Sequence, residues 1–420
     1  MLLKSVRVIM LWMGLLLKMK TVLKNCKFIV TQNSNRDIWE KMDILISRNI
    51  ILRIGKDLHA ENEIDCSQNI VMPGLINLHT HVGMQLLRGI ADDMPLDEWL
   101  EKKIFPAEAK LTPDKIYVAS TMAIREMLRT GTTCFNDMYM SMDRVAEAAE
   151  ELGIRAFLSR GLLDVDGSNK SKERLEDSTN LYKYIKKLKS SRINFAIGPY
   201  TPFTCSKDLL LQTQKLSKKK YPVHIHVAET QKEVKNALRD FGKSPVEYLE
   251  SINFLKNNVI AVHCCWITKE DTKILADKNV TVVHCPRSNM KLASGSIMPL
   301  RELQKAGILV GLGTDSAVSN NNLDMFEEMR SCAYLQKQNY CNATVAPAQK
   351  VLDMATINGA KALNLRAGTI KAGNFADLVL LDAKHFLLQP LEKDRIVSHL
   401  VYSANGSCVD KVFVNGKKVI

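Results

Sequence analysis

The strongest signal in the sequence lies in one short stretch, Val71-Met-Pro-Gly-Leu-Ile-Asn-Leu-His-Thr-His81. Its proline and glycine break the preceding element, and the apolar run 75–78 that follows is typical of a buried parallel strand. Side chains alternate between the two faces of a strand, so His79 and His81 point the same way and can bind one ion together. The spacing therefore predicts a metal site at the carboxyl end of a strand. The alternative interpretation is a chance pair of polar residues that ends the strand.

The sequence after this strand alternates strand-like runs with helical patterns, which is typical of βα units and a parallel sheet. Thr112-Pro113 is typical of an N-cap and first turn, and Gly131 ends the helix that they begin. The predicted strands are 75–81, 132–137, 155–161, 194–200, 222–228, 259–264, 280–285 and 308–314. Further helices are predicted at 141–152, 172–190, 206–219, 244–252, 268–278 and 299–306. Eight such strands predict a (β/α)8 barrel, and a doubly wound open sheet is the alternative.

In a (β/α)8 barrel the functional side chains lie at the carboxyl ends of the strands. Those ends carry, after His81, the residues Asp137, Arg160, Tyr200, His226 with Glu229, His263, His284 and Asp315. Six of the nine histidines, His224 included, fall on predicted strands, whereas His59, His385 and His399 do not. Chance placement would scatter histidines over helices and loops as well, so this distribution favours a metal site.

The residues predicted to hold the ion are His79, His81, His226 and Asp315. His224 shares a strand face with His226, and we assign the one nearer the strand end as the ligand and His224 as a packing or supporting residue. Asp315 follows two glycines that allow a close backbone approach, although an aspartate here could instead cap a helix. Three histidines and one aspartate, with water in an open position, suit Zn²⁺. No lysine ends the fourth predicted strand, so we expect a single ion.

Other residues at the strand ends have more than one interpretation. His263 and His284 could each be buried core histidines, and His263 lies nearer the end of its strand. Asp137 and Arg160 could form a structural pair. The sequence alone assigns no role to either of these two residues.

Both ends of the chain are predicted to be rich in short strands. These strands are 22–31, 43–47, 50–54 and 69–72 near the start, then 378–381 and a hairpin of 409–414 with 417–420. Asn415-Gly416 suits the tight turn of that hairpin. Neither end could easily bury its faces alone, so 19–72 and 365–420 are predicted to form one small β-sandwich beside a barrel of 73–364. Residues 1–18 resemble the start of a signal peptide without a cleavage site, and we interpret them as a doubtful extension.

The composition is that of an ordinary globular chain of 420 residues, 46% hydrophobic and 25% charged. Its net charge of +13 suggests a nucleic-acid binder, but the lysine runs at 184–189 and 215–220 are not interleaved with the aromatics that stack on bases. We interpret these runs as solvated helix faces. Ten cysteines without a Cys-x-x-Cys pair fit a reducing cytoplasm. The apolar run 8–17 is too short to span a bilayer, so we expect neither a nucleic-acid nor a membrane partner.

Four longer motifs carry a resemblance to a known family: Pro73-Gly-Leu-Ile-Asn-Leu-His-Thr-His81, His224-Ile-His-Val-Ala-Glu-Thr230, His284-Cys-Pro-Arg-Ser-Asn-Met-Lys291 and Gly313-Thr-Asp-Ser316. They resemble the amidohydrolase superfamily, and more narrowly its methylthioadenosine/S-adenosylhomocysteine deaminases. The similarity extends through 87–93, 105–112, 131–138, 355–363 and 368–379, so it covers essentially residues 20–420. Within that family, its overall look resembles the archaeal 5′-deoxyadenosine deaminase branch. The resemblance implies an amidohydrolase-type TIM barrel, a small-molecule nucleoside substrate and a homo-oligomer, either a tetramer or a dimer.

The resemblance also implies roles for single residues. His79, His81, His226 and Asp315 would hold one Zn²⁺ per subunit, with Fe²⁺ or Mn²⁺ as alternatives. Glu229 would contact the purine and move its proton, and Glu108 would bind the ribose hydroxyls, with Asp315 and Arg160 as further substrate contacts. One segment departs from the family, because Pro199-Tyr-Thr-Pro-Phe-Thr204 stands where the family has Pro-His-x-Pro-Tyr-Thr. Tyr200 thus replaces a substrate-contacting histidine, which leaves the preferred 5′ substituent open.

The implied reaction is hydrolytic deamination of adenosine, 5′-deoxyadenosine, methylthioadenosine or S-adenosylhomocysteine to the inosine-type product and ammonia. The ion lowers the pKa of a bound water toward ~7, and the hydroxide attacks C6 of the adenine. Asp315 accepts the proton of the water, Glu229 protonates N1, and His263 orients the attacking oxygen. An alternative is a deaminase or chlorohydrolase of the same superfamily that acts on guanine, cytosine or a triazine. Two alternatives belong to other classes of protein. A non-catalytic assembly barrel would be expected to have lost its metal ligands, yet all four are present. A nucleic-acid binder is favoured only by the net charge of +13.

Overall fold

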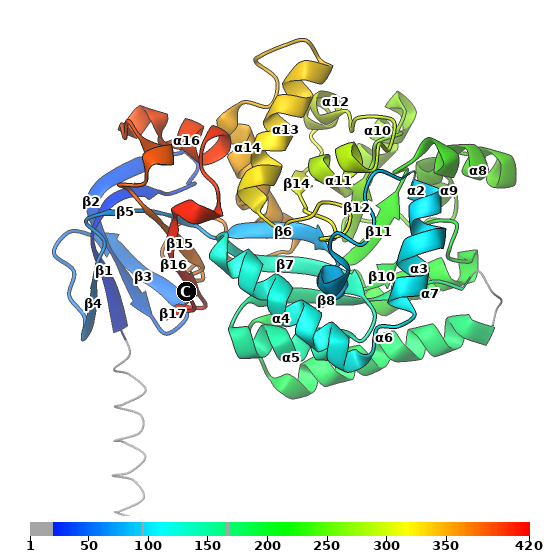
Figure 1. The fold of residues 1–420 in the computed structure, drawn as a ribbon, viewed down its shortest axis with the longest axis horizontal. Helices are drawn as coiled ribbons and strands as arrows, with labels where there is room; N and C mark the ends of the chain where they lie inside the picture. Colours follow the sequence, from blue (N-terminus) through cyan, green and yellow to red (C-terminus); the bar gives the residue numbers. More distant parts are fainter. Residues whose placement is uncertain (1–19, 95, 165–168) are drawn as a thin grey trace, which may run out of the picture.

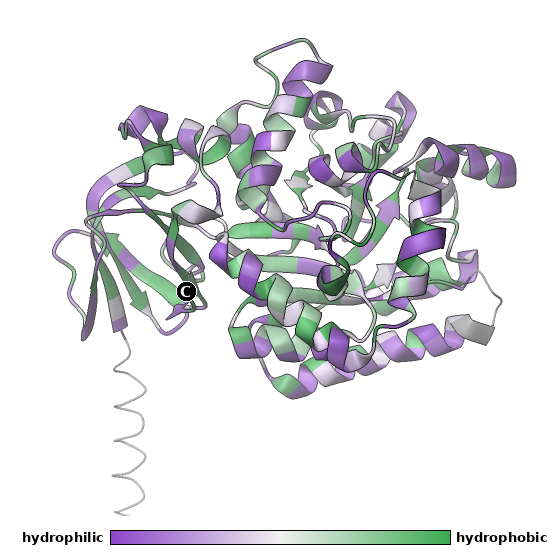
Figure 2. Ribbon diagram, viewed as in Figure 1, coloured by the Kyte–Doolittle hydropathy of each residue, from purple (hydrophilic) through white to green (hydrophobic). Residues whose placement is uncertain are grey.

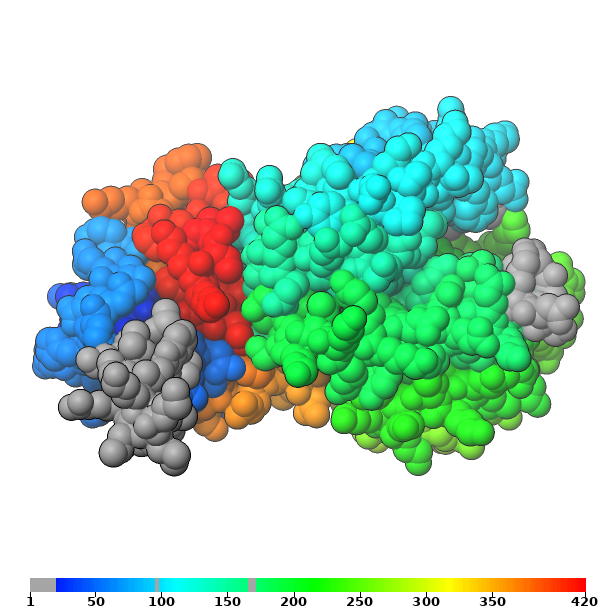
Figure 3. All heavy atoms as spheres, turned by 90° about the horizontal axis from the view of Figure 1, so that it is seen from below, coloured from blue at the N-terminus to red at the C-terminus, as the bar shows by residue number. Residues whose placement is uncertain are grey.

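The computed structural model describes residues 20–94, 96–164 and 169–420. Strands from the two ends of the chain gather at one side, and the middle of the chain forms the larger body (Figure 1). Figure 3 shows the same division from below, with the blue and red ends together and the cyan and green middle beside them. Residues 1–18, interpreted above as an extension, lie outside the described ranges. No helix within these ranges is long and apolar enough to cross a membrane.

A ring of parallel strands forms the centre of the larger body. In chain order the strands are β6 (Leu75–Thr80), β7 (Thr132–Tyr139), β8 (Arg155–Leu162), β9 (Ile193–Phe195), β10 (Gly198–Pro199), β11 (Val223–Val227), β12 (Val259–His263), β13 (Thr281–His284) and β14 (Val310–Leu312). They form two parallel sheets, one from β6 to β10 and one from β11 to β14. Isolated bridges join Ile197 to Val223 and Thr80 to Asp315, and these bridges close the ring. The predicted barrel-type fold is therefore confirmed, and the open sheet is excluded.

The fourth predicted strand, 194–200, is wrong in one respect because it is broken into β9 and β10. Both pieces pair with β8, and the break falls at Ala196 and Ile197. The Ala196 N–H donates to Leu158 O of β8, whereas the next N–H, that of Ile197, donates to Pro222 O beside β11. Consecutive amides point to opposite sides in any central strand, so the broken strand still lies between β8 and β11.

Helices surround the ring, and their polar faces point outward. They include α4 (Pro113–Arg129), α5 (Met142–Leu152), α6 (Asn169–Leu188), α7 (Lys207–Ser217), α8 (Gln231–Phe241), α9 (Pro245–Ser251), α10 (Lys269–Asp277), α11 (Pro286–Lys291), α12 (Leu300–Lys305), α13 (Met325–Asn339), α14 (Ala348–Ala355) and α15 (Ile357–Ala362). The start of α4 is as predicted, because the Thr112 side chain accepts from Lys115 N. Figure 2 shows mostly hydrophobic strands inside and many hydrophilic positions on outer helices such as α6 and α8. This pattern buries the apolar strand residues between the ring and the helices.

Strands from both ends of the chain pair in a second sheet, called here the terminal sheet. It contains β1 (Lys20–Val30), β2 (Ile38–Ser47), β3 (Ile50–Gly55), β4 (Asn62–Asp65), β5 (Asn69–Pro73), β15 (Leu378–Asp382), β16 (Val409–Val414) and β17 (Lys417–Lys418). Its order is β17-β16-β15-β5-β1-β2-β3, with β4 beside β1. The antiparallel pair β5–β15 joins the two ends, and β16–β17 is the predicted hairpin. The sequence analysis missed β4, which has only four residues and no buried position.

One buried ion pair fastens the terminal sheet to the ring. Arg155, the first residue of β8, donates from Nε and Nη2 to the two carboxylate oxygens of Asp377, at 2.8 and 3.1 Å. The two side chains are only 1% and 2% exposed. The Asn415 N–H donates to the same carboxylate at 2.7 Å, and the Arg155 guanidinium lies 4.3 Å from the centre of the Phe375 ring. Two-point geometry and full burial make this pair a specific contact between the two parts of the fold.

Candidate active site

Three predicted site residues meet where β6 and the segment after β14 come together. Asp315 Oδ1 lies 3.3 Å from Nε2 of both His79 and His81. The two glycines before Asp315 allow this approach. A Cβ on Gly313 would lie 2.7 Å from His79 Cβ, and a Cβ on Gly311 would lie 2.3 Å from the Leu78 side chain. Because these two glycines have no side chain, the backbone before Asp315 can lie directly against Leu78 and His79 of β6, as expected.

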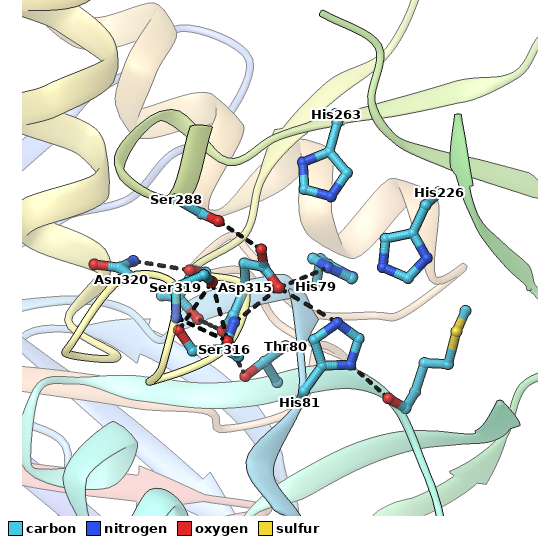
Figure 4. Close-up of polar contacts among 12 residues, drawn as sticks. His79, Thr80, His81, His226, His263, Ser288, Asp315, Ser316, Ser319 and Asn320 are labelled. Carbon is cyan, nitrogen blue, oxygen red and sulfur yellow. Dashed lines mark hydrogen bonds and ion pairs between the residues drawn. The ribbon is translucent and has the colours of Figure 1, made fainter. Parts of the chain in front are cut away.

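Two further histidines complete the cluster from β11 and β12. Donor atoms of His79, His226 and His263 lie within 4.8 Å of one another, as do those of His79, His81 and Asp315. The two groups share His79, so the four predicted ligands and His263 surround one space. Figure 4 shows these five side chains pointing toward one another. His263 was predicted as a catalytic residue, and the structure brings it within reach of the ion site as well.

Each of the three histidines assigned as ligands has a partner for its Nδ1 atom. His79 Nδ1 lies 2.8 Å from His224 Nε2, His81 Nδ1 lies 2.5 Å from Met138 O, and His226 Nδ1 lies 2.8 Å from Tyr200 O. Such contacts fix ring orientation and leave Nε2 for a ligand. His79 Nε2 is buried and makes no hydrogen bond to any described residue. The donor set thus fits a divalent metal ion, and His224 supports His79, in accord with its expected supporting place.

Burial and the aspartate set the charges in the cluster. Burial lowers the pKa of His79 to about 3 and that of His226 well below its usual value. For His81, burial acts in the same direction, but the contact with Asp315 prevails and raises the pKa to about 9. The pKa of Asp315 is held well below its usual value, because contacts with His79 and His81 outweigh the effect of burial. Neutral imidazoles and an ionised carboxylate are the forms that bind a metal ion, so His79, His226 and Asp315 are in the binding form, whereas His81 must release its proton to bind one.

Glu229 lies beside this cluster with its carboxyl group enclosed. Its Oε2 atom is 3.6 Å from His263 Nε2. Burial, reinforced by the negative charge of Asp315, raises the pKa of Glu229 to about 8. Glu233, in the first turn of α8, accepts from the Glu229 N–H at 2.7 Å, and burial likewise raises its pKa to about 8. A carboxyl group in such a site is protonated at neutral pH and can donate a proton.

A cavity of about 580 Å³ opens above the cluster. This volume lies within the range of small-molecule sites. The cavity is lined by His81, Met84, Trp99, Leu100, Ile104, Phe105, Glu108, Met138, Tyr139, Met140, Arg160, Gly161, Leu163, Tyr200, Thr201, Phe203, Thr204, His226, Glu229, Thr230, Lys232, Glu233, Asn236, His263, Leu292, Asp315, Ser316 and Ser319. Every residue predicted to contact substrate is among them, as is Tyr200.

Much of the apolar wall comes from a segment whose structure the sequence analysis did not foresee. Between β6 and α4 the chain forms η1 (Val82–Leu87), α2 (Leu96–Trp99), η2 (Leu100–Ile104, a π-helix) and α3 (Phe105–Glu108). Short irregular helices of this kind are frequent at functional sites. The Tyr139 hydroxyl at the end of β7 donates to Glu108 Oε1 at 2.6 Å, and burial raises the pKa of Glu108. This contact attaches the segment to the ring.

The remaining residues from the strand ends lie in other surroundings. Arg160 lines the cavity, but its Nε is 3.6 Å from the carboxylate of Asp177, and the suggested pairing with Asp137 is wrong. Asp137 instead accepts from Val82 N at 3.2 Å. His284 contacts Gln336 at 3.1 Å and belongs to neither group of possible ligands among the described residues.

The backbone is strained at two site residues. His263 and Asp315 have φ angles of 72° and 59°, in the left-handed region that residues other than glycine seldom adopt. Such strain persists only where the surrounding structure enforces it, and it concentrates at active sites. No sequence pattern indicated these angles.

Comparisons with known proteins agree with this geometry. Residues 70–419 match the Amidohydrolase family. The 5-methylthioadenosine/S-adenosylhomocysteine deaminase of Thermococcus sibiricus is 47% identical over 383 residues, which are 90% of each chain. The 5′-deoxyadenosine deaminase of Methanothermobacter thermautotrophicus is 44% identical over 89% of this chain and 88% of its own.

A solved structure, that of an adenosine deaminase from Xanthomonas campestris with bound zinc, superposes with a TM-score of 0.90 at 33% identity. It covers 95% of this chain and 92% of its own. The match to the family extends over most of the sequence and includes each of the strands that surround the cluster. The chain belongs to the amidohydrolase family.

Proposed function

We propose that this protein is a metal-dependent aminohydrolase that converts adenosine-type nucleosides to the inosine-type product and ammonia. One observation carries the proposal: a buried carboxyl group with a raised pKa, that of Glu229, lies beside a cluster of histidines and Asp315 on the wall of one cavity. A proton donor next to a metal site is what hydrolysis of an amino-substituted ring requires. The names of the similar proteins described above support the same reaction.

The proposed cofactor is one Zn²⁺ held by His79, His81, His226 and Asp315. When bound, the ion acts as a Lewis acid that lowers the pKa of a water molecule. The neutral rings of His79 and His226 and the ionised Asp315 carboxylate support this assignment, as does the zinc in the similar solved structure. Fe²⁺ and Mn²⁺ remain alternatives, because the same nitrogen and oxygen donors bind them.

Three residues of the chain are proposed to move protons and orient the attacking oxygen. Glu229 donates a proton to N1 of the adenine, which makes C6 electrophilic. Asp315 accepts a proton from the water, and this proton passes to the departing amino group, which leaves as ammonia. The second proton of the water, on the oxygen at C6, returns to Glu229 as the carbonyl group forms. His263, with Nε2 toward Glu229, orients the oxygen that adds to C6. Each such transfer contributes roughly 10²–10⁴-fold to the rate.

The other cavity residues are proposed to bind the rest of the nucleoside. Glu108, oriented by Tyr139, accepts hydrogen bonds from the ribose hydroxyls. Arg160 is proposed as a further substrate contact, although its guanidinium also donates to Tyr139 O and Gly161 O. Tyr200 covers one side of the His226 ring, with the ring centres 4.7 Å apart. We leave the 5′ substituent open among the deoxy, methylthio, homocysteinyl and hydroxyl forms.

The arrangement of the whole chain is proposed as well. Residues 19–72 and 365–420 form a small sandwich domain around the terminal sheet, and residues 73–364 form the catalytic barrel. The active form is proposed to be a homo-oligomer, a tetramer or a dimer, in a reducing compartment. The ten cysteines, all unpaired, are compatible with that compartment.

The test is ammonia release by zinc-loaded protein from adenosine, 5′-deoxyadenosine, methylthioadenosine and S-adenosylhomocysteine, with guanine, cytosine and a triazine as comparison substrates. We expect turnover of at least one nucleoside and its loss after chelation. Turnover of only a comparison substrate would replace the proposed substrate class. No release from any compound by zinc-loaded protein would refute the deaminase function.

A further inference from the structure

The first turn of α11 places two neighbouring side chains against two different site residues. This helix begins just after β13, and Ser288 and Asn289 are 0% and 6% exposed. Neither residue lines the cavity. Both nevertheless make hydrogen bonds to residues that do line it. Their position is that of a support behind the reacting groups.

Ser288 gives the two oxygens of Asp315 different surroundings. Its hydroxyl donates to Asp315 Oδ2 at 2.6 Å, a contact drawn in Figure 4. The other oxygen, Oδ1, accepts from Ser316 N at 2.8 Å and faces the Nε2 atoms of His79 and His81. The carboxylate therefore cannot rotate without losing a short hydrogen bond on each side. Ser288 thus helps to keep Oδ1 toward the two histidines.

Asn289 contacts the imidazole ring of His263 in a similar way. Its Nδ2 lies 3.1 Å from His263 Nδ1 and 3.3 Å from Ser294 Oγ. An amide N–H donor makes Nδ1 the acceptor, so the neutral ring carries its hydrogen on Nε2. That Nε2 atom faces Glu229 Oε2 at 3.6 Å. The hydrogen bond from Asn289 therefore decides which ring nitrogen of His263 presents a proton to the cavity. The backbone of His263 is also strained, with φ in the left-handed region.

Helix α13 holds the first turn of α11 through Glu328. Arg287 N donates to Glu328 Oε2 at 3.4 Å, and the Arg287 guanidinium donates to Asn322 Oδ1 at 2.7 Å. Glu328 also accepts from Asn320, whose amide donates to Thr314 O beside Asp315. The turn and the Asp315 loop thus share one anchor on α13. Movement of one would disturb the other.

We propose that Ser288 and Asn289 are a pair of positioning residues that act through Asp315 and His263. Ser288 fixes the orientation of the carboxylate, and Asn289 fixes the tautomer and direction of the imidazole. This proposal rests on the proposed deaminase function for its kinetic consequences. Its structural consequences, at the metal site and at the His263 ring, do not depend on the substrate. Supporting residues of this kind typically change metal affinity or activity by about 10- to 100-fold when removed.

The decisive variant is Asn289→Asp, because it keeps the size of the side chain but removes the N–H donor. We expect kcat to fall about 10- to 100-fold with KM changed less than about threefold. Asn289→Ala serves as the second variant, and we expect Asn289→Asp to be at least as impaired as Asn289→Ala. A space-filling role predicts the opposite order. Full activity of Asn289→Asp would overturn the assignment for Asn289.

Ser288→Ala is expected to lower kcat by about 10- to 100-fold and to weaken zinc binding in competition with a chelator. Wild-type kcat together with wild-type zinc affinity would overturn the assignment for Ser288. Ser296→Ala and the exposed Asn257→Asp are matched controls that should leave both readouts unchanged. Thermal unfolding of every variant identifies any that fails to fold, in which case Ser288→Thr, which keeps the hydroxyl, should restore zinc binding.

A readout independent of turnover separates this proposal from the proposed function. ¹⁵N spectra of the histidine rings, with His263 assigned by its own substitution, should show the Nε2–H tautomer in the wild type and its loss in Asn289→Asp. If the wild-type protein deaminates no nucleoside, the function fails while the tautomer and zinc results still decide this proposal. If turnover is present but the tautomer is unaffected in Asn289→Asp, this proposal fails alone.

Discussion

The buried pair between Arg155 and Asp377 allows a quantitative test of how the terminal sheet is joined to the ring. The substitution Asp377→Asn keeps the shape of the side chain and an acceptor for Asn415 N, but it removes the negative charge. The Arg155 side chain, 1% exposed, would then be a buried cation without a counter-ion. Loss of one partner of such a pair costs about 3–5 kcal/mol. This is a large part of the ~5–15 kcal/mol that usually stabilises a domain.

The second substitution, Arg155→Met, separates charge from packing. In the double variant Arg155→Met with Asp377→Asn no unpaired charge is left, and replacement of a buried pair by groups of similar volume is often close to neutral. We therefore expect the double variant to be more stable than Asp377→Asn alone. The measurement is urea denaturation followed by circular dichroism, with the four proteins compared by their midpoints at a common slope.

The control is Glu40→Gln, which removes an exposed ion pair to Lys393 with side chains 48% and 53% exposed. Exposed pairs of this kind contribute less than about 1 kcal/mol, so its midpoint should be nearly that of the wild type. The reasoning is refuted if Asp377→Asn costs no more than this control. It is equally refuted if the losses of the two single variants simply add in the double variant.

Three further predictions concern the site and its surroundings. Glu229→Gln should lower kcat by about 10²–10⁴-fold in an ammonia-release assay while metal content, measured by elemental analysis, stays unchanged; near-normal turnover would remove its role in proton transfer. His226→Ala should lose both metal and activity, whereas His224→Ala should weaken metal binding by about 10- to 100-fold; full zinc occupancy of His226→Ala would transfer the ligand role to His224. Burial raises the pKa of Glu328 to about 8, so the folded chain holds this proton more tightly than the unfolded chain does. The free energy of unfolding should therefore fall as pH rises from about 4.5 to 8, by up to ~1.4 kcal/mol per pH unit for this group, and level off above. Glu328→Gln should lack that decline in urea titrations at several pH values, and parallel curves for the two proteins would contradict the reasoning.

The cluster of proposed metal ligands could be predicted from the sequence because side chains alternate along a strand with a fixed period. The alternation of side chains predicted that His79, in β6, and His81, directly after it, point the same way, and the two glycines before Asp315 indicated a crowded strand end. The same local reasoning assigned His226, rather than His224, as the metal ligand. It needed only the alternation of side chains along a strand and the order of elements along the chain.

Features that depend on contacts between distant segments were not predictable in this way. The break between β9 and β10, at Ala196 and Ile197, has no signal in the sequence pattern. The π-helix at Leu100–Ile104 has no periodic signal of its own. The approach of His263 to the ligand site depends on a left-handed backbone angle that propensities disfavour. In each case tertiary packing overrides local preference.

The bridge between Thr80 and Asp315 has a consequence for how this protein matures. At this closing contact the first strand of the ring meets the residues after its last strand, and the proposed metal ligands His79, His81 and Asp315 lie beside it. A nascent chain that ends before Asp315 lacks the residue that closes the ring of strands and one of the four proposed metal ligands. We therefore expect ring closure and metal binding to be late steps of folding, and a bound cation would stabilise the contact between Thr80 and Asp315. We expect withdrawal of the ion to loosen this junction first, so that amide exchange after chelation should rise earliest around Thr80 and Asp315.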